Sequence, residues 1–435
     1  MGRNLRDRLR LIRKEAQAGK TQPGGSPEAA REGEFPEAGA LKGWSAGGYK
    51  TLKRSVRTEL SLEVPGAFPS ALGFLIPDIF SYQAFSKSGA PPLPGDLLFF
   101  DLETTGLSGG AGTVAFLAAF GRFDGPGASA KAGALLIDQY LLLDYPGEED
   151  FLKAAAGEFK PAGGKPPLAV TFNGKSFDAQ VLKTRFRMKG LAEPPYYHAD
   201  LLHPARRLWK RPLGDCSQKN LESSVLGIER CGDLDGALAP DIWFSFLKTG
   251  DTGDLLGICD HNVRDLRGLA SLFLALGEIA ASPLESRGKF SFDFEALCLW
   301  WRKAALSREK SLLSPHGTEK GRELLRAAAE EGCPRAAYTR ALDAFREGRP
   351  GEGRRLLLSL AGRPGPQAEG GLKAAAFRAL AVDAEWRRKD PAAALAYAEA
   401  ALAVDGLGEA AREDLLKRRE RLAGKPAGSP LAFKL

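Results

Sequence analysis

The sequence predicts two domains of different class: an α/β domain, with a mixed sheet flanked by helices, and an all-α domain after it. Three observations predict this organisation. Short apolar segments bounded by Gly-rich or polar turns recur between residues 97 and 202, as is typical of strands. From residue 148 these segments alternate with stretches of helical composition. From about Phe294 to Leu422 the chain is rich in Ala, Leu, Arg and Glu and is predicted to be nearly all helical.

The first 48 residues are expected to contribute little to the core. Residues 1–48 begin with a basic stretch and then turn rich in Gly, Pro, Ala and Glu. Such a composition cannot bury a core, so we expect a basic, largely disordered tail. Apolar residues at helical spacing are compatible with a short helix over residues 4–18. Residues 49–95 are expected to be a lead-in segment that packs on the α/β domain.

The α/β domain is expected over residues 96–285. Its pattern gives three strands in succession, then strands that alternate with helices, and then helices up to about residue 282. The expected strands are residues 97–103, 114–123, 134–144, 168–174 and 196–202, and the expected helices among them are residues 148–159 and 177–190.

The helical domain is expected over residues 290–425 and carries a repeated pattern. Residues 375–405 place small residues and an aromatic at the spacing of a helix pair, and residues 336–361 look like a degenerate copy. Pro391 and Pro350 stand at the same point of the turn in the two copies. Both segments resemble tetratricopeptide units. A plain Ala-rich helical bundle is the alternative interpretation.

Composition argues against several classes of protein. The five cysteines are scattered and never form a C-x-x-C pair, which argues against a disulfide scaffold and a structural zinc site and favours a reducing cytoplasm. There is no run of 18 apolar residues, and the first 20 residues are charged throughout, so we expect neither a transmembrane helix nor a secretory signal. The net charge of +7 favours polyanionic partners. Most of it lies in residues 1–60, with a second basic concentration from Lys183 to Arg230.

The clearest chemical motif is D-L-E-T-T-G-L at residues 101–107. Alternate residues of a strand share a face, so Asp101 and Glu103 are expected to point the same way at the end of an apolar strand. Two adjacent carboxylates repel each other unless a cation lies between them, and hard oxygen ligands suit Mg²⁺ or Mn²⁺. A D-x-E sequence in an ordinary exposed loop is the alternative.

Two further motifs supply acids and a histidine. In N-G-K-S-F-D, residues 173–178, Asp178 falls in the first turn of a helix, where the helix dipole favours a carboxylate whatever its function. In H-N-V-R-D, His261 and Asp265 are four residues apart and therefore share one face of a helix. Taken singly, Asp178 is a helix-start residue and a lone histidine is usually structural.

These motifs and a fourth, D-L-L-H-P-A-R-R-L-W-K at residues 200–210, form a recognisable set. The chain resembles the DEDD 3′–5′ exonucleases of the ribonuclease-H-like superfamily. It is most similar to the bacterial YprB-type subfamily, whose members join such a domain to C-terminal tetratricopeptide-like helices. The resemblance covers residues 97–282, where the motifs stand in the expected order. It implies a ribonuclease-H-like mixed sheet flanked by helices.

The resemblance implies an acidic tetrad of Asp101, Glu103, Asp178 and Asp265 that holds two divalent cations, Mg²⁺ or Mn²⁺. Asp101 would bridge both ions, Glu103 and Asp265 would hold the ion with the attacking water, and Asp178 would support the second ion. His261 occupies the position of the general base. It stands four residues before Asp265, which is the spacing of the tyrosine subclass, whereas the histidine subclass usually places its histidine five residues before.

Residues around the tetrad are expected to form a nucleic-acid groove. Thr104, Thr105 and Leu107 resemble positions that contact the terminal nucleotide. Arg206, Arg207 and Lys210 are cations suited to phosphate contact. The neighbouring Trp209 either stacks on a base or belongs to the core of a basic amphipathic helix. The expected substrate-binding residues are Thr104, Thr105, Leu107, Asn173, Lys175, Arg206, Arg207 and Lys210.

The resemblance implies a metal-dependent 3′–5′ exonuclease that hydrolyses phosphodiester bonds, on DNA rather than RNA, in repair or processing. A ribonuclease H or resolvase-like endonuclease would share the acidic cluster. An inactive scaffold that binds nucleic acid and recruits partners through helical repeats is the alternative from another class. The helical domain is expected to dock a protein partner such as a helicase, and no membrane partner is expected.

Overall fold

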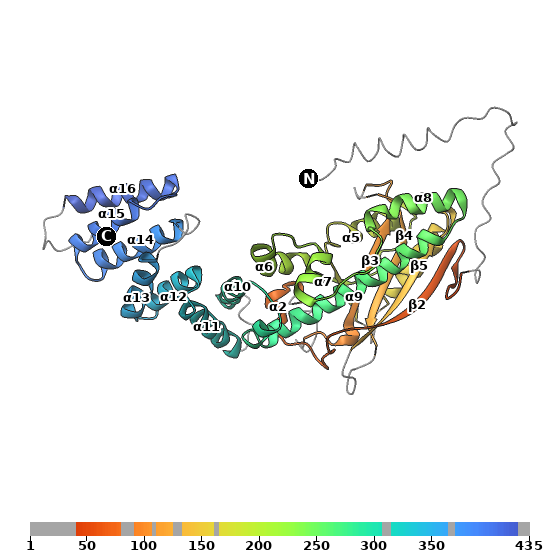
Figure 1. Ribbon diagram of the computed structural model, residues 1–435, viewed down its shortest axis with the longest axis horizontal. Helices are drawn as coiled ribbons and strands as arrows, with labels where there is room; N and C mark the ends of the chain where they lie inside the picture. Colours follow the sequence, from red (N-terminus) through yellow and green to blue (C-terminus); the bar gives the residue numbers. More distant parts are fainter. Residues whose placement is uncertain are drawn as a thin grey trace, which may run out of the picture.

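A computed structural model of the chain describes residues 41–79, 91–106, 110–124, 133–160, 165–306, 315–363 and 370–424. Within these residues a mixed sheet flanked by helices is followed by a helical region, which is the predicted architecture (Figure 1). The predictions made for residues 1–40, including the short helix, and for Leu107 fall outside the described residues.

The sheet of the described residues has seven strands in the order β1-β2-β5-β4-β3-β6-β7. Strand β3 lies between β4, its antiparallel neighbour, and β6, its parallel neighbour, and β7 is parallel to β6. Strand β5 is antiparallel to both of its neighbours, β2 and β4. The strands are β1 (Ser45–Gly48), β2 (Thr51–Glu59), β3 (Leu97–Thr104), β4 (Ala115–Phe123), β5 (Ala134–Leu142), β6 (Leu168–Thr171) and β7 (Tyr197–Asp200).

The five predicted strands are all present, as β3 to β7, but β6 ends earlier than expected. The expected strand ran to residue 174, whereas β6 ends at Thr171. Asn173 has a φ of 68°, a left-handed conformation that breaks a strand and that Asn tolerates better than most residues. The chain therefore turns at the N-G-K sequence, and this turn leads into α5.

Strands β1 and β2 were not predicted. We expected residues 49–95 to pack on the domain, but β2 is a nine-residue strand that joins the sheet through β5. Apart from Leu52 and Val56 its side chains are polar or charged, and they are mostly half-buried or exposed beyond Leu52. An edge region of a sheet needs little apolar surface, so composition gave no clear strand pattern here.

Helices cover both faces of the sheet. Helices α4 and α5 pack on the face that carries Phe100, whereas α9 from Leu266 onward packs on the face that carries Phe99. Figure 1 shows α9 as the long helix that runs along the sheet. The helices from α2 to α9 are α2 (Leu72–Leu75), α4 (Glu148–Glu158), α5 (Asp178–Met188), α6 (Leu202–Leu213), α7 (Gln218–Leu226), α8 (Ala239–Thr249) and α9 (Gly253–Ala281).

The apolar core continues from the sheet domain into α10. Phe99 of β3 and Trp301 of α10 belong to one cluster of buried side chains, and the same cluster reaches Leu324. The indole N–H of Trp209 donates to the carbonyl oxygen of Ser291 at 2.8 Å. Buried apolar side chains on the two sides of residues 285–290 thus belong to one cluster. A domain boundary at these residues stays a prediction.

The helices after the sheet domain pack in succession and extend away from the sheet (Figure 1). Pro350 and Pro391 are the first residues of α13 and α15, as expected from the repeated pattern. Proline suits this position because the first helical N–H has no partner within the helix. These helices are α10 (Phe294–Leu306), α11 (Pro315–Glu330), α12 (Pro334–Arg346), α13 (Pro350–Ala361), α14 (Gly370–Trp386), α15 (Pro391–Leu402) and α16 (Glu409–Ala423). None of the helices in the described part of the chain is both long enough and apolar enough to cross a membrane.

Candidate active site

The two carboxylates of the D-x-E motif lie on β3, on the face that α9 covers. Asp101 and Glu103 follow Phe99 at two-residue intervals, so the strand pleat directs all three to the same side. Phe99 is fully buried, Asp101 is half-buried and Glu103 is buried. The strand therefore carries two acids from the apolar core to the edge of the domain, as the sequence predicts.

A relay of buried amides orients Asp101. The side-chain amide of Asn262 donates to Oδ2 of Asp101 at 2.7 Å, and its carbonyl oxygen accepts from Gln139 at 2.9 Å. Asn262 and Gln139 are both fully buried. Neither residue was predicted to matter, although Asn262 lies inside the H-N-V-R-D motif.

Asp178 is the first residue of α5, as predicted, and it is buried. Burial raises the pKa of Asp178 to about 7, although hydrogen bonds from the backbone N–H groups of Asp178 and Leu102 oppose the shift. A carboxyl group that loses water at this position is stabilised when a cation replaces the solvent.

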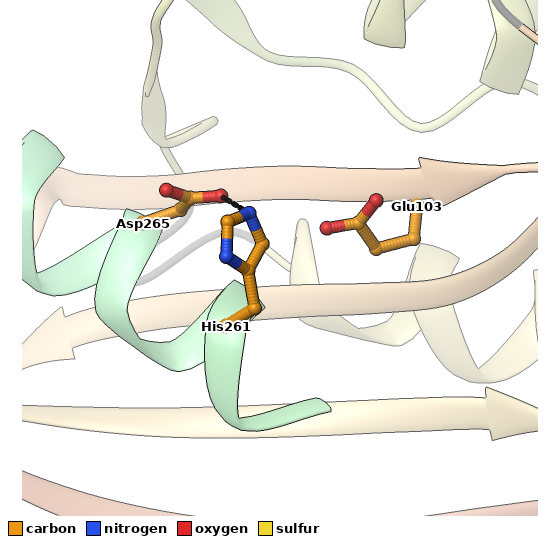
Figure 2. A group of neighbouring side chains, drawn as sticks. All are labelled: Glu103, His261 and Asp265. Atoms are coloured by element: carbon orange, nitrogen blue, oxygen red, sulfur yellow. Dashed lines mark ion pairs between the residues drawn. The ribbon is translucent and has the colours of Figure 1, made fainter. Parts of the chain in front are cut away.

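His261 and Asp265 lie on α9 and contact each other. Nε2 of His261 is 3.1 Å from Oδ2 of Asp265, so the two residues, which were expected to share one face of a helix, are also in contact. In Figure 2 the imidazole ring lies between the carboxyl groups of Asp265 and Glu103. The other ring nitrogen, Nδ1, is 2.8 Å from Oδ1 of Asp233. Each nitrogen of the ring thus has its own carboxylate.

Arg230 ties the site to the loop that precedes α8. Its nearly buried guanidinium forms a bidentate pair with Glu222 of α7, at 2.6 Å for both bonds. It also lies 2.6 Å from Oδ1 of Asp265 and 3.2 Å from Oδ2 of Asp233. One buried cation therefore holds three carboxylates from three segments of the chain.

Mutual repulsion and burial shape the electrostatics of the site. Burial, reinforced by the charges of Asp178, Asp265 and Glu103, raises the pKa of Asp101 well above its usual value. Burial and the charge of Asp265 raise the pKa of Glu103 to about 8. Burial opposes the charged form of His261, but hydrogen bonds with Asp265 and Asp233 outweigh that effect and raise its pKa to about 9. Metal-free protein thus retains protons here that ordinary acids would have lost.

The donor set fits a divalent cation. One carboxylate oxygen of Glu103, one of Asp265 and one ring nitrogen of His261 all lie within 4.8 Å of one another. Asp101 and Asp178 are close enough to raise the pKa of Asp101 through repulsion. Oxygen-rich sites of this kind suit Mg²⁺ or Mn²⁺, and no cysteine takes part.

The turn before α5 is built around a residue that was not predicted to have a role. Asp200, at the end of β7, accepts hydrogen bonds from the backbone N–H groups of Asn173 at 2.8 Å and Lys175 at 3.1 Å. The ammonium group of Lys175 pairs with Asp78 at 2.5 Å. Asn173 and Lys175 thus lie at the turn that leads to Asp178, while their contact with substrate stays a prediction.

The two threonines of the D-L-E-T-T-G-L motif have local hydrogen bonds. The hydroxyl of Thr104 donates to the carbonyl of Gly106 at 2.9 Å, and that of Thr105 accepts from the N–H of Val114 at 3.0 Å. These bonds hold the turn next to Glu103. Contact of either threonine with a nucleotide stays a prediction.

The predicted basic residues lie on α6, which starts directly after β7. Arg206, Arg207 and Lys210 are exposed, but Trp209 between them is fully buried. Of the two interpretations of Trp209, the structure shows the core residue of a basic helix, so this indole does not stack on bases. The three cations do not take part in the carboxylate cluster.

Sequence reasoning missed the residues that support the cluster. Arg230, Asp233 and Asp200 belong to loops or to the end of a strand, where no periodicity marks them. Their contacts join residues that are far apart in the chain, such as His261 and Asp233, 28 positions apart. A buried arginine among several acids is the signal that would have pointed to Arg230. A single sequence does not show which residues of a loop are buried.

Two comparisons bear on this geometry. Residues 98–276 match the sequence model of the RNase H superfamily, which agrees with the fold class expected from the motifs. The chain is also similar to a protein of Bacillus subtilis (strain 168) named "Uncharacterized protein YprB". The two are 37% identical over 209 residues, which is 47% of this chain and 48% of that protein. The similarity thus spans about half the length of the relative.

Proposed function

We propose that this protein is a metal-dependent 3′–5′ exonuclease that hydrolyses the phosphodiester bonds of DNA. The observation that carries the proposal is that four acids from three separate elements, β3, α5 and α9, lie close enough to raise the pKa of Asp101, and that two of them, Glu103 and Asp265, lie within 4.8 Å of a ring nitrogen of His261. An acidic cluster costs stability without a cation, so the chain retains it for a purpose other than folding. The similarity to the RNase H superfamily supports nucleic-acid hydrolysis as that purpose.

The residues of the cluster divide the work of cation binding. In the proposal Asp101 would contribute to the sites of two Mg²⁺ or Mn²⁺ ions, Glu103 and Asp265 would hold the ion next to the attacking water, and Asp178 would support the second ion. Ions held there would lower the pKa of water and stabilise charge on the attacking and leaving oxygens. Asn262 fixes one oxygen of Asp101, and Arg230 holds one oxygen of Asp265 at 2.6 Å.

His261 is proposed as the general base or as the residue that orients the attacking water. Asp233 holds Nδ1 at 2.8 Å, so Nε2 is the nitrogen that faces the acids. In metal-free protein Nε2 contacts Asp265, and although burial opposes the charged form, the contacts with Asp265 and Asp233 raise the pKa of the imidazole to about 9. Cations bound to Asp265 and Glu103 would neutralise the charges that raise the pKa of His261. The imidazole could then lose its extra proton, and Nε2 would be free to accept a proton from water.

The direct test is the release of mononucleotides from end-labelled DNA in Mg²⁺ or Mn²⁺, with and without a blocked 3′ end. A 3′–5′ exonuclease shortens the open strand from its 3′ end and leaves the blocked strand intact. Cutting of circular single-stranded DNA would identify the endonuclease alternative instead. Binding without any hydrolysis would identify the scaffold. The same strand made of RNA tests the preference for DNA.

Asp101→Ala and Asp254→Ala provide a matched pair of variants for this assay. Asp254 is an exposed acid in the first turn of α9, two turns before His261. Its loss removes the same charge from the same part of the protein without touching the cluster. Activity that survives Asp101→Ala would refute the proposal, because a contaminating nuclease or another site would then be responsible.

The proposal assigns protein docking to the helices α11 to α16. Successive helices that pack as repeats form extended surfaces suited to a protein partner, and a helicase would supply single-stranded DNA to an exonuclease. The test is co-purification with a helicase before and after removal of α14 to α16. Unchanged co-purification would exclude those helices as the docking surface.

A further inference from the structure

A basic hollow lies where the sheet domain meets the helical region. It has a volume of about 430 Å³ and is lined by residues of α6, of α10 and of the start of α12. Its cations come from both parts of the chain. They are Arg206, Arg207, Lys210 and Arg211 of α6, Lys303 of α10 and Arg335 of α12.

The acids near the hollow are already used. Asp293 and Glu295 both pair with Arg211, at 2.7 and 2.9 Å. Asp293 also accepts from the backbone N–H of Ala296, and Glu295 from that of Arg335. These two acids fix the junction between α6, α10 and α12, and both pair with the same one of the six cations, Arg211.

The other five cations have no carboxylate partner among the residues that the structure describes. All five are exposed. Arg207 stacks its guanidinium on the ring of Trp300, 4.1 Å from the ring centroid, which fixes its position and leaves its N–H groups free for an anion. Like charges gathered in one hollow repel one another, and that repulsion is relieved when an anion binds.

The chemistry of the hollow selects phosphate rather than bases. Guanidinium and ammonium groups bind phosphate oxygens well, and Arg does so through paired hydrogen bonds. Trp300, the aromatic residue of the lining, is almost fully buried and already covered by Arg207, so its ring is not free to stack on a base. A ligand recognised here is therefore bound through its backbone and without regard to sequence.

The hollow is connected to the carboxylate cluster through α6. This helix starts right after β7, whose last residue, Asp200, holds the turn that leads to Asp178. Twelve residues of α-helix span roughly 18 Å, so the cations near the end of α6 lie several nucleotides from the edge of the sheet where the helix begins. A strand that reached the cluster with its end could have its inner phosphates along α6.

We propose that this basic hollow binds the backbone phosphates of the same nucleic-acid strand whose 3′ end is hydrolysed at the carboxylate cluster. The inference rests on the proposed exonuclease function and adds a substrate-binding role for the helical region. Lys303 and Arg335 then contribute to affinity for long strands and leave the reaction at the strand end unaffected.

The test uses the full chain with Lys303 and Arg335 both changed to Gln. The matched control is Arg412→Gln with Lys417→Gln, which removes two exposed cations of α16, remote in sequence from the hollow. Binding of labelled single-stranded DNA of 4 to 20 nucleotides is measured by fluorescence anisotropy at several salt concentrations. All proteins in this arm also carry Asp101→Ala, so that the DNA is not degraded.

We expect the hollow variant to bind the 20-nucleotide strand about tenfold more weakly and the 4-nucleotide strand almost normally. The slope of log K against log salt should become shallower by about 0.7 for each phosphate that the variant no longer neutralises. Equal losses of affinity in the hollow variant and the control, or no loss in either, would overturn the proposal. Preferential loss of binding to a poly-Glu peptide, with DNA binding unchanged, would show that the hollow takes an acidic protein segment and would also overturn it.

A second arm separates this inference from the proposed function. Proteins with an intact Asp101 are assayed with Mg²⁺ on the 20-nucleotide strand and on the p-nitrophenyl ester of thymidine 5′-monophosphate. The hollow variant should have a higher KM for the strand and an unchanged rate on the ester. If the unmodified chain hydrolyses neither substrate, the exonuclease proposal fails, while the binding arm still decides whether the hollow holds DNA.

Discussion

The carboxylate cluster and the basic hollow bind charge in opposite ways. In the cluster, like charges are largely withdrawn from water, and some of the acids are held by further residues, as Asn262 holds Asp101 and Arg230 holds Asp265. In the hollow, five like charges stay exposed, and of these Arg207 is held by its ring contact and Lys210 by a hydrogen bond to the carbonyl oxygen of Gly214. The carboxylate cluster is therefore stabilised by bound cations and holds its side chains in fixed positions. The basic hollow stays solvated without a ligand and is suited to bind phosphates in more than one arrangement.

The largest effect is expected from the cluster itself. Asp101→Ala, Glu103→Ala, Asp178→Ala and Asp265→Ala should each lower nuclease activity by about 10⁴-fold or more, because each removes a ligand of a reacting ion. Melting temperature in EDTA should stay equal or rise, since each substitution removes an acid that is unfavourable to bury and that repels its neighbours when ionised. The rise should be smallest for Asp265, which also loses its ion pair with Arg230. A cluster that only stabilises the fold would show the reverse, with lower melting temperatures and active protein.

The next effect concerns His261. Substitution by Ala should lower turnover by roughly 10²–10⁴-fold, the usual contribution of proton transfer, while metal affinity changes little. His203→Ala, at an exposed position of α6, is the matched control. A mainly structural histidine would instead lower the melting temperature with modest loss of rate, so both quantities are measured on each variant.

A smaller effect is expected from Gly236, in the short helical turn before α8. A Cβ added there would lie 2.8 Å from Nε2 of His261, so Gly236→Ala must displace the imidazole ring. We expect about a tenfold loss of turnover, as is typical for residues that only position a ligand or base, with little change in melting temperature. Gly157→Ala makes the same chemical change on α4 where no neighbour lies within 4 Å, and it should be silent. Equal rates for the two variants would show that the position of Nε2 does not matter.

The smallest effect is a pH dependence of stability in metal-free protein. The folded-state pKa of Glu103 is raised from 4.5 to about 8, and that of His261 from 6.5 to about 9. Between those limits the folded chain binds more protons than the unfolded chain, so stability must fall as pH rises from 5 to 9. The melting temperature in EDTA should show this fall, and Mg²⁺ should reduce it. Glu103→Gln should flatten the lower part of the curve, whereas Asp254→Asn should leave the curve as in the unmodified chain.

The part of the site that could be predicted is the part with local spacing. The pleat of β3 aligned Asp101 with Glu103, and the helical repeat of α9 joined His261 to Asp265, because both periodicities are properties of the backbone alone. Arg230 and Asp233 depend on how a loop folds over α9, which no periodicity encodes. The same limit applied to β2, whose pairing with β5 across some 85 residues compensates for a mostly polar sequence.

The end of the sheet domain stays a prediction for a different reason. Composition changes near residue 290, and we expected a boundary there, whereas the apolar cluster of the sheet domain continues through Trp301 of α10. A chain that ends at residue 290 would expose that surface of the core. Composition reports what a segment is made of, and it does not report which neighbour the segment packs against.

The hydrogen bonds of the two buried amides beside Asp101 all run in one direction, from donor to acceptor toward Asp101. Arg54 on β2 can only donate, and it donates to the carbonyl oxygen of Gln139 at 2.6 Å. The amide NH₂ of Gln139 must then face Asn262, and the NH₂ of Asn262 must face Asp101. An arginine at the margin of the sheet thereby fixes the orientation of two neutral groups that could otherwise flip. An asparagine at position 101 would have to present its oxygen to Asn262, so its own NH₂ group would point toward the proposed cations. A group that repels cations would then stand where the second carboxylate oxygen of Asp101 attracts them.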